Sequence, residues 1–392
     1  MLAKLLCHKF FQKSLTHLHK ARTKTLLDCG DALIHSNRLT LTSIGRHLHG
    51  SAHVKHKIKR VDRFLKNKYL YQEKVDIYKA IVQPIIANLP YLAIAIDWSG
   101  CCTHKYHLLR ASLLVDGRSL TIFNMVVEQN DLESRDKHSL FLKQLNQIIG
   151  EHQRIYIVTD GGFLTPWYSE VISLGWHVIG RVRGKMKCCI EKTGQWKTLK
   201  ELHVEASTTP TTLGKARLAQ HSPTACDAYL HLYHGEAKGR KGKSRFTKDT
   251  KMYQNLAKEP WVLSSTDEML SSEQVVKLYA KRTQIEQNFR DDKSQRYGFS
   301  WRFSQSNTVE RISILCLIAF VGSMALWFIG YEAESKKWHV KFQANTVKGH
   351  RVLSFLTLAK QVLTHMRRRI TQNYIDKSLQ NFNKNYLKYS VL

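Results

Sequence analysis

The spacing of apolar residues changes near residue 90 of the chain. Upstream of that point, apolar residues recur at helical spacing among lysines and arginines, over residues 1–35, 39–48 and 53–67. Downstream, the apolar runs are short and continuous, as expected for buried strands: YLAIAID (91–97), HLLRASLLV (107–115) and SLTIFNMVV (119–127). The pattern predicts a helical N-terminal region followed by the start of a sheet.

Elements of alternating type follow these three predicted strands. Asp116 and Gly117 separate the second strand from the third and predict a hairpin. The next segments have the patterns of a helix, a strand, a short helix and a strand, at 137–149, 154–160, 166–173 and 176–183. Three antiparallel strands followed by right-handed crossovers predict a mixed α/β sheet.

Residues 184–260 interrupt this alternation. They are rich in threonine, lysine, glycine and histidine, and they include a basic loop at 238–251. We expect a β-rich insertion over this range. The regular pattern then resumes with a strand and a long helix at 271–293, in which Ser271 and Gln274 can form a capping box.

An uncharged run of 19 residues, Ile312 to Gly330, has two interpretations. Its length is just sufficient for a helix that spans a bilayer. A helix buried against a sheet has a similar composition, and basic residues lie on both sides of this run. Because minimal length is weak evidence for a membrane span, we favour the buried helix.

Two of the N-terminal segments together have the form of a helix-turn-helix motif. Thr42 can cap a short first helix, and Gly50 with Ser51 can form the turn that precedes the second helix. An ordinary helical hairpin with a solvated basic face has the same pattern, so both interpretations stay open. The candidate DNA-binding residues on the second helix are Lys55, Lys59, Arg60 and Arg63.

The charge of the chain narrows the range of partners. The 61 lysines and arginines exceed the 31 aspartates and glutamates, which gives a formal net charge of +30. Such an excess costs self-repulsion in the compact state, and a polyanionic partner relieves it. Nucleic acid is therefore the first expectation, and an anionic membrane surface the second. The eight cysteines contain no CxxC pair and indicate reduced thiols, not a disulfide framework.

Three acidic residues are candidates for a catalytic site. Asp97 and Asp160 each end an apolar strand, and neighbouring parallel strands would place both carboxylates at one edge of the sheet. Taken alone, each aspartate is also typical of a turn. The third candidate, Glu286, lies among cations on a predicted helix and is also typical of a surface ion pair. Three carboxylates together would suit Mg²⁺ ions that promote attack on phosphodiesters. At about 100° per residue, one stripe of the helix at 271–293 contains Tyr279, Arg282, Glu286, Arg290 and Lys293.

Part of this stripe resembles a known signature. Tyr279, Arg282, Glu286 and Lys293 fit the spacing Y-x2-R-x3-E-x6-K, the YREK motif of the insertion-sequence-four family of bacterial transposases. Further similar segments extend over nearly the whole chain: LTLTSIGRHL, KHKIKRVDRFL, AIDWS, LLRASLLVDGRSLT, GWHVIGRVRGK, AKEPWVL and FQANTV.

The resemblance implies an RNase H-like core with a DDE triad formed by Asp97, Asp160 and Glu286, which would bind Mg²⁺, with Mn²⁺ as a substitute. Trp261 lies where related transposases place a tryptophan that receives a flipped base, and a core aromatic residue on a strand fits the pattern equally well. Arg290 is a further candidate DNA contact, from its place on the helical stripe alone. The phosphate contacts of the family correspond to Tyr279, Arg282 and Lys293.

The expected domain plan has five parts. They are a helical DNA-binding domain (1–85), the first part of an RNase H-like α/β core (86–183), the β-rich insertion (184–260), the second part of the core (261–330) and a helical C-terminal region (331–392).

By resemblance, the protein is a cut-and-paste transposase that acts through hairpin ends, as a homodimer, on terminal inverted repeats and target DNA. A host DNA-bending protein is a further candidate partner. No membrane partner is expected, and the expected location is the bacterial cytoplasm, at the nucleoid. Two alternative functions stay open: an RNase H-like DNA endonuclease without strand transfer, and a DNA-binding regulator.

Overall fold

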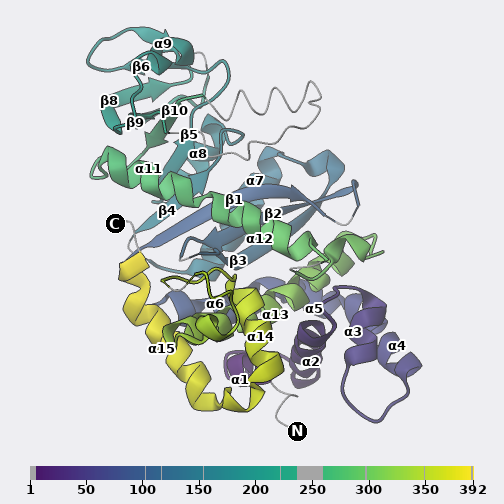
Figure 1. The fold of residues 1–392 in the computed structure, drawn as a ribbon. Helices are drawn as coiled ribbons and strands as arrows, with labels where there is room; N and C mark the ends of the chain where they lie inside the picture. Colours follow the sequence, from purple (N-terminus) through teal and green to yellow (C-terminus); the bar gives the residue numbers. More distant parts are fainter. Residues whose placement is uncertain are drawn as a thin grey trace, which may run out of the picture. The chain divides into compact units, whose positions relative to one another are not determined.

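The chain folds into two compact units in a computed structural model that describes residues 6–101, 103–115, 117–152, 154–220, 222–235, 259–295, 298–347, 349–389 and 392. The first unit consists of Met1–Gln153 with Thr283–Ser390, and the second of Arg154–Arg282 with Val391–Leu392. Figure 1 shows the elements of both units. The first unit is described before the second.

In the described residues, the N-terminal part of the first unit consists of the helices α1 (Leu6–Phe11), α2 (Lys20–Ser36), α3 (Leu41–His47), α4 (Val54–Leu65), α5 (Lys68–Gln72) and α6 (Lys74–Ile86). The prediction that Thr42 caps α3 is wrong. Thr40 is the N-cap, because its extended backbone lets its hydroxyl accept the Ser43 N–H. A Cβ on Gly45 would lie 2.7 Å from Cα of Ile58, so only glycine permits the close packing of α3 on α4.

Three antiparallel strands follow in the first unit, in the order β3-β2-β1: β1 (Leu92–Gly100), β2 (Tyr106–Leu113) and β3 (Leu120–Glu128). A short turn of 3₁₀ helix, η2 (Gln129–Asp131), leads to α7 (Arg135–Ile149). In the predicted hairpin between β2 and β3, Gly117 has a φ of 69°, a conformation that favours glycine, while Asp116 lies outside the described residues.

A long apolar helix, α13 (Val309–Ser335), forms the centre of the first unit and contacts α2, β3, α14 (Phe355–His365) and α15 (Gln372–Tyr389) (Figure 1). By length and composition it could cross a membrane, but 94% of its most apolar window is buried inside the protein. The structure thus agrees with the buried-helix interpretation. Three 3₁₀ turns accompany these helices: η3 (Trp301–Phe303), η4 (Trp338–Lys341) and η5 (Arg367–Arg369).

The second unit begins with β4 (Ile155–Thr159), α8 (Thr165–Ser173) and β5 (His177–Arg181), in which β4 and β5 pair in parallel. The expected β-rich insertion follows, although its basic loop at 238–251 lies outside the described residues. Its described elements are β6 (Lys187–Ile190), β7 (Trp196–Thr198), α9 (Leu199–His203), β8 (Thr211–Leu218) and β9 (Cys226–Tyr233). With β10 (Trp261–Ser265), the strands of this unit have the order β4-β5-β10-β9-β8-β6-β7.

The helix predicted at 271–293 is two helices, α11 (Ser272–Lys281) and α12 (Thr283–Lys293), so the single-helix prediction is wrong. The predicted capping box of Ser271 and Gln274 is present at the start of α11. At the break, the N–H of Arg282 bonds to the carbonyl of Tyr279, three residues back, which tightens the last turn. Taken together, the described elements confirm the mixed α/β class, with helical regions near both ends of the chain.

Candidate active site

Asp97 marks the point at which β1 leaves the core of the first unit. Residues 92–96 are buried, Asp97 is half-buried, and β1 continues to Gly100 rather than ending at Asp97 as the sequence predicted. The strand continues because Trp98, Ser99 and Gly100 still pair with β2, and this pairing satisfies the hydrogen bonds of their backbone. The apolar pattern of the sequence does not report such pairing. One carboxylate oxygen of Asp97 accepts the Trp98 N–H at 2.8 Å.

Buried polar contacts fasten α12, which carries Glu286, to the strands of the first unit. Arg110 of β2 lies opposite Asp97 in the strand register, so both side chains leave the same face of the sheet. The Arg110 guanidinium donates to Asp292 of α12 at 2.6 Å and to Asn124 of β3 at 2.8 Å. The guanidinium also lies over the Phe289 ring, with 4.7 Å between the guanidinium carbon and the ring centroid. These contacts hold α12 over the strand that carries Asp97.

Further side chains of α12 contact the segment between β2 and β3. The Gln284 amide donates to the Val115 carbonyl at 2.9 Å, and the Asn288 amide donates to the Ser119 carbonyl at 2.7 Å. Asp291 accepts from the Arg118 guanidinium at 2.8 Å. Asp291 and Asp292 therefore have structural partners within the first unit.

Asp97 and Glu286 line one open pocket of the first unit, with a volume of about 600 Å³. Arg290 and Lys293 line the same pocket, so the members of the predicted stripe that belong to α12 share one surface. Glu286 and Arg290 are exposed, which suits contact with a large substrate. This pocket brings two of the three predicted catalytic residues together.

Lys293 is held at the wall of this pocket. Its ammonium group donates to the Ser99 hydroxyl at 2.6 Å. Burial lowers the pKa of Lys293, and the positive charge of nearby Arg302 acts in the same direction. A cation kept in low-dielectric surroundings attracts an incoming phosphate more strongly than a fully solvated one.

Asp160 lies in the second unit, directly after β4. Its Oδ1 accepts the Gly162 N–H at 2.9 Å, which fixes the turn that ends the strand. Because β4 and β5 are parallel, the residues that follow both strands lie at the same edge of this sheet. Arg183 follows β5, and a Cβ on Gly161 would lie 2.5 Å from its Cδ, so the Arg183 side chain packs against the Asp160 turn.

The remaining motif residues of the second unit form an aromatic and cationic group. Trp261 is half-buried at the start of β10, with its ring edge-on to Tyr279 at 5.0 Å and a centroid distance of 5.7 Å to Tyr233. The Arg282 guanidinium lies 5.8 Å from the Tyr279 ring. Burial raises the pKa of the Tyr279 hydroxyl. The nearby charges that act on that hydroxyl belong to Arg282, Arg181, Asp160 and Arg183.

The ligand chemistry of these residues fits a hard divalent cation. Asp97 and Glu286 offer carboxylate oxygens to one pocket, and Asp160 offers the same ligand type in the second unit. Within the parts of the chain that the structure describes, no three histidine, cysteine, aspartate or glutamate side chains form a metal-binding group. The three predicted ligands belong to different units, two in the first and one in the second.

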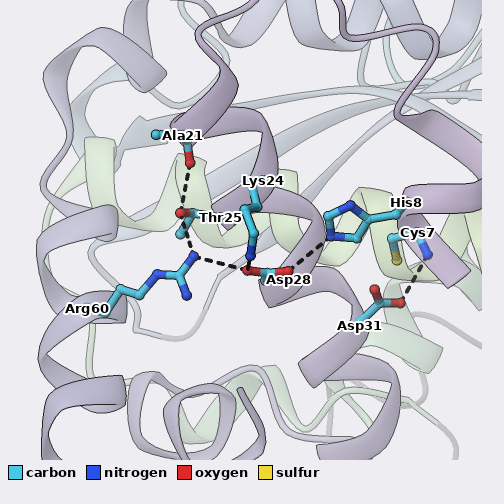
Figure 2. Close-up of polar contacts among 8 residues, drawn as sticks. All are labelled: Cys7, His8, Ala21, Lys24, Thr25, Asp28, Asp31 and Arg60. Atoms are coloured by element: carbon cyan, nitrogen blue, oxygen red, sulfur yellow. Dashed lines mark hydrogen bonds and ion pairs between the residues drawn. The ribbon is translucent and has the colours of Figure 1, made fainter. Parts of the chain in front are cut away.

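The predicted DNA-binding helix is α4 of the first unit. Lys55, Lys59 and Arg63 are exposed on it, as a backbone-binding face requires. Arg60 differs, because its guanidinium donates to Asp28 of α2 at 3.0 Å and to the Thr25 hydroxyl at 2.9 Å (Figure 2). The Arg60 side chain thus braces α4 against α2.

Three arginines that organise these sites were not predicted from the sequence. Arg110 and Arg118 anchor α12, and Arg183 packs on the turn after Asp160. The available signal was a charge at the centre of an otherwise apolar strand, as at Arg110, which requires a buried partner. The sequence did not identify that partner as Asp292.

The fold and these groups of side chains suit an enzyme that acts on phosphodiesters. The family model described as the transposase DDE domain matches residues 91–321, which is 231 of the 392 residues. The chain belongs to this transposase family. No curated protein matches the chain. A solved structure with some similarity is the cryo-EM structure of the piggyBac transposase synaptic complex with hairpin DNA. It is 12% identical, with a TM-score of 0.40, over 97% of this chain and 82% of that chain.

Proposed function

We propose that this transposase cuts the ends of a bacterial insertion sequence and joins them to new DNA, with Asp97, Asp160 and Glu286 as its catalytic carboxylates. One observation carries the proposal. Asp97 and Glu286 are 189 residues apart in the chain (286 − 97), yet they line one pocket together with Arg290 and Lys293. The proposal adds Asp160 from the sequence motif, and it rests on the family to which the chain belongs.

DDE transposases use divalent metal ions, and we propose Mg²⁺, with Mn²⁺ as a substitute. Asp97 and Glu286 in the first unit and Asp160 in the second are the residues that would hold the ions. When bound, two such ions activate the attacking oxygen and stabilise the leaving oxygen of the phosphodiester.

The cations of the first pocket orient the DNA backbone for this reaction. Lys293, held by Ser99, places a positive charge near Asp97, and Arg290 extends the positive surface along α12. A phosphate held in line for attack needs no further ordering at the moment of reaction, which lowers the barrier. In the second unit, Arg282 and Tyr279 are the corresponding candidates for phosphate contacts.

We further propose, from the YREK spacing, that the protein belongs to the insertion-sequence-four family and is similar to the transposase of transposon ten. That relationship implies hairpin intermediates at the element ends, a homodimer that pairs both ends, and action in the bacterial cytoplasm at the nucleoid. The same proposal includes terminal inverted repeats and target DNA as partners, and it leaves a host DNA-bending protein as an optional partner.

An excision assay in cells tests the proposed function. A donor plasmid carries the element without its own transposase gene, and the protein is expressed from a second plasmid. We expect excised element and new insertions with the wild type, and neither with Asp97→Asn at equal protein level. Breaks at the element ends without any insertion would instead indicate an endonuclease without strand transfer. Repression of a promoter at the element end without breaks would indicate a regulator.

A further inference from the structure

The C-terminal region of the first unit is strongly basic. Between Lys336 and Lys377 the sequence has ten lysines and arginines, and Asp376 is the one acidic residue. Neither the candidate catalytic residues nor the candidate helix-turn-helix of α3 and α4 accounts for this excess. A positive charge of this density indicates a polyanionic ligand, because its release of counterions favours binding.

Two adjoining hollows gather these charges on one surface. The first, of about 790 Å³, runs along the end of α14 and η5, and the second, of about 430 Å³, lies beside the start of α15. Arg369 lines both hollows, so they form one continuous surface, which we call the C-terminal basic surface. The other cations that line it are Lys336, Lys341, Arg367, Arg368 and Lys377.

Most of these cations lack an acidic partner. Among the described residues, Lys341, Arg368, Arg369 and Lys377 take part in no ion pair, and all four are exposed. In contrast, Lys336 at the rim of the surface pairs with Glu332 at 3.2 Å. The charge of the centre of the surface is thus available to a ligand.

The aromatic rings of this surface favour a contact with backbone over a contact with bases. Trp338 and Tyr374 stack on each other, with centroids 5.6 Å apart and an angle of 22° between the rings. Phe342 and His365 are stacked in the same way at 5.8 Å. Each stack covers one face of both of its rings, which reduces the ring surface left for stacking with single-stranded bases. The exposed cations therefore favour the phosphates of a duplex as the ligand.

The C-terminal basic surface adjoins the helix-turn-helix within the first unit. Arg367 donates to the ring of His35, near the end of α2, at 3.2 Å. The His35 ring is edge-on to His49, 6.2 Å away, in the turn between α3 and α4. A duplex that lies on α4 and its turn therefore has a second cationic surface next to it on the same unit.

We propose that the C-terminal basic surface binds the phosphate backbone of the element-end duplex that is held by α3 and α4. This inference rests on the proposed transposase function and on the predicted DNA-binding role of α3 and α4. It assigns to the C-terminal region a share of end binding that is independent of sequence, because phosphate contacts set position and affinity without reading bases.

The test compares two double variants that remove the same charge. R368A/R369A removes two arginines of the C-terminal basic surface, and K79A/K143A removes two exposed lysines of α6 and α7 that do not line it. Affinity is measured over a salt series with a labelled duplex that contains the terminal inverted repeat flanking the gene, and with a scrambled duplex. Thermal unfolding of both variants checks that each is folded.

For R368A/R369A we expect weaker binding of the end duplex and a salt dependence lower by about two units of slope, since each phosphate contact contributes about 0.9. Backbone protection on the end duplex should shrink on one side of the α4 footprint, whereas K79A/K143A should match the wild type. Equal slopes for both variants would overturn the inference. So would a defect seen only in joining to target DNA, or only in binding to anionic lipid vesicles. If the wild type does not prefer the end duplex over the scrambled one, the proposed function itself fails.

Discussion

The Arg110 guanidinium and the Asp292 carboxylate form an ion pair with an N–O distance of 2.6 Å, and their side chains are only 4% and 11% exposed. Arg110 lies opposite Asp97 in the sheet, and Asp292 follows Glu286 on α12. The pair therefore joins the two elements that carry two of the proposed catalytic carboxylates. We infer that the pair positions the carboxylates of Asp97 and Glu286, so its loss should affect both the stability of the fold and the activity.

We predict that Arg110→Ala lowers the free energy of unfolding by about 3–5 kcal/mol, because it leaves the Asp292 charge buried without a partner. Denaturant unfolding measures this loss. Lys197→Ala serves as the control, because the side chains of its pair with Glu205 are 27% and 47% exposed and the pair should contribute less than about 1 kcal/mol. Replacing both Arg110 and Asp292 by apolar residues should recover much of the stability. Equal losses for Arg110→Ala and the control would refute the structural role.

We predict that Asp97→Asn, Asp160→Asn and Glu286→Gln each abolish cleavage and leave binding to the element end largely intact. Each amide keeps the size of the carboxyl group and removes the negative charge that a divalent cation requires. Cleavage and gel-shift assays on the same duplex separate the two properties. Glu273→Gln, an exposed acid at the start of α11, provides the control. Substantial cleavage by any one variant would remove that residue from the triad.

Lys293→Ala should weaken complexes with the element end and lower the salt slope of binding by about one unit, as expected for the loss of one phosphate contact. Lys293→Arg keeps the charge and should retain most of the slope. The measurement is a titration at several salt concentrations. An unchanged slope for Lys293→Ala would place the ammonium group away from the phosphate.

Trp261 allows a test of base stacking against simple packing. If its ring receives a flipped base, Trp261→Ala should lose about 1–3 kcal/mol of stacking free energy at the step after binding. Trp261→Phe should keep much of that stacking free energy. Because Trp261 is half-buried and contacts Tyr233 and Tyr279, we expect some loss of stability, and a fall in cleavage rate that is larger than this loss explains. A large fall in melting temperature with a proportional loss of activity would make Trp261 a packing residue only.

The stability of the N-terminal helices should depend on the ionisation of Asp31. Burial raises the pKa of this carboxyl to about 6, although its Oδ1 accepts the Cys7 N–H at 3.0 Å (Figure 2). The unfolded value is about 3.9. Between these values the folded state binds more protons than the unfolded state, so the free energy of unfolding falls as pH rises from about 4 to about 6, and the penalty is constant above that range.

Asp31→Asn should remove this pH dependence. Relative to the wild type, the variant should gain up to about 3 kcal/mol of stability between pH 4 and pH 6, which corresponds to the two-unit shift in pKa. Denaturant unfolding at a series of pH values measures the difference. A difference between the two proteins that is independent of pH would show that Asp31 ionises normally.

The sequence predicted the class of the fold because local patterns determine it. Continuous apolar runs indicate the strands, and the capping box at Ser271 and Gln274 indicates the start of α11, as observed. The same reasoning placed Glu286, Arg290 and Lys293 on one helical face, and they line one pocket. A period of 3.6 or 2 residues can be recognised from neighbouring residues alone, without information on distant contacts.

What the sequence could not predict depends on contacts between distant segments. The pairing of Arg110 with Asp292 joins residues 182 positions apart, and no local pattern encodes it. The extension of β1 beyond Asp97 comes from pairing with β2, and at the break between α11 and α12 the Arg282 N–H bonds to the Tyr279 carbonyl three residues back. The packing of Arg183 on Gly161 likewise requires the parallel neighbour strands.

The most direct test of the proposed function is a reaction of the purified protein with a labelled fragment of its own element end, with Mg²⁺ and with EDTA. We predict cleavage at the terminus and joined products in Mg²⁺ and neither in EDTA, with hairpin ends among the intermediates. Binding without cleavage in Mg²⁺ or Mn²⁺ would contradict the account, because a shared pocket of Asp97 and Glu286 would then have no catalytic role.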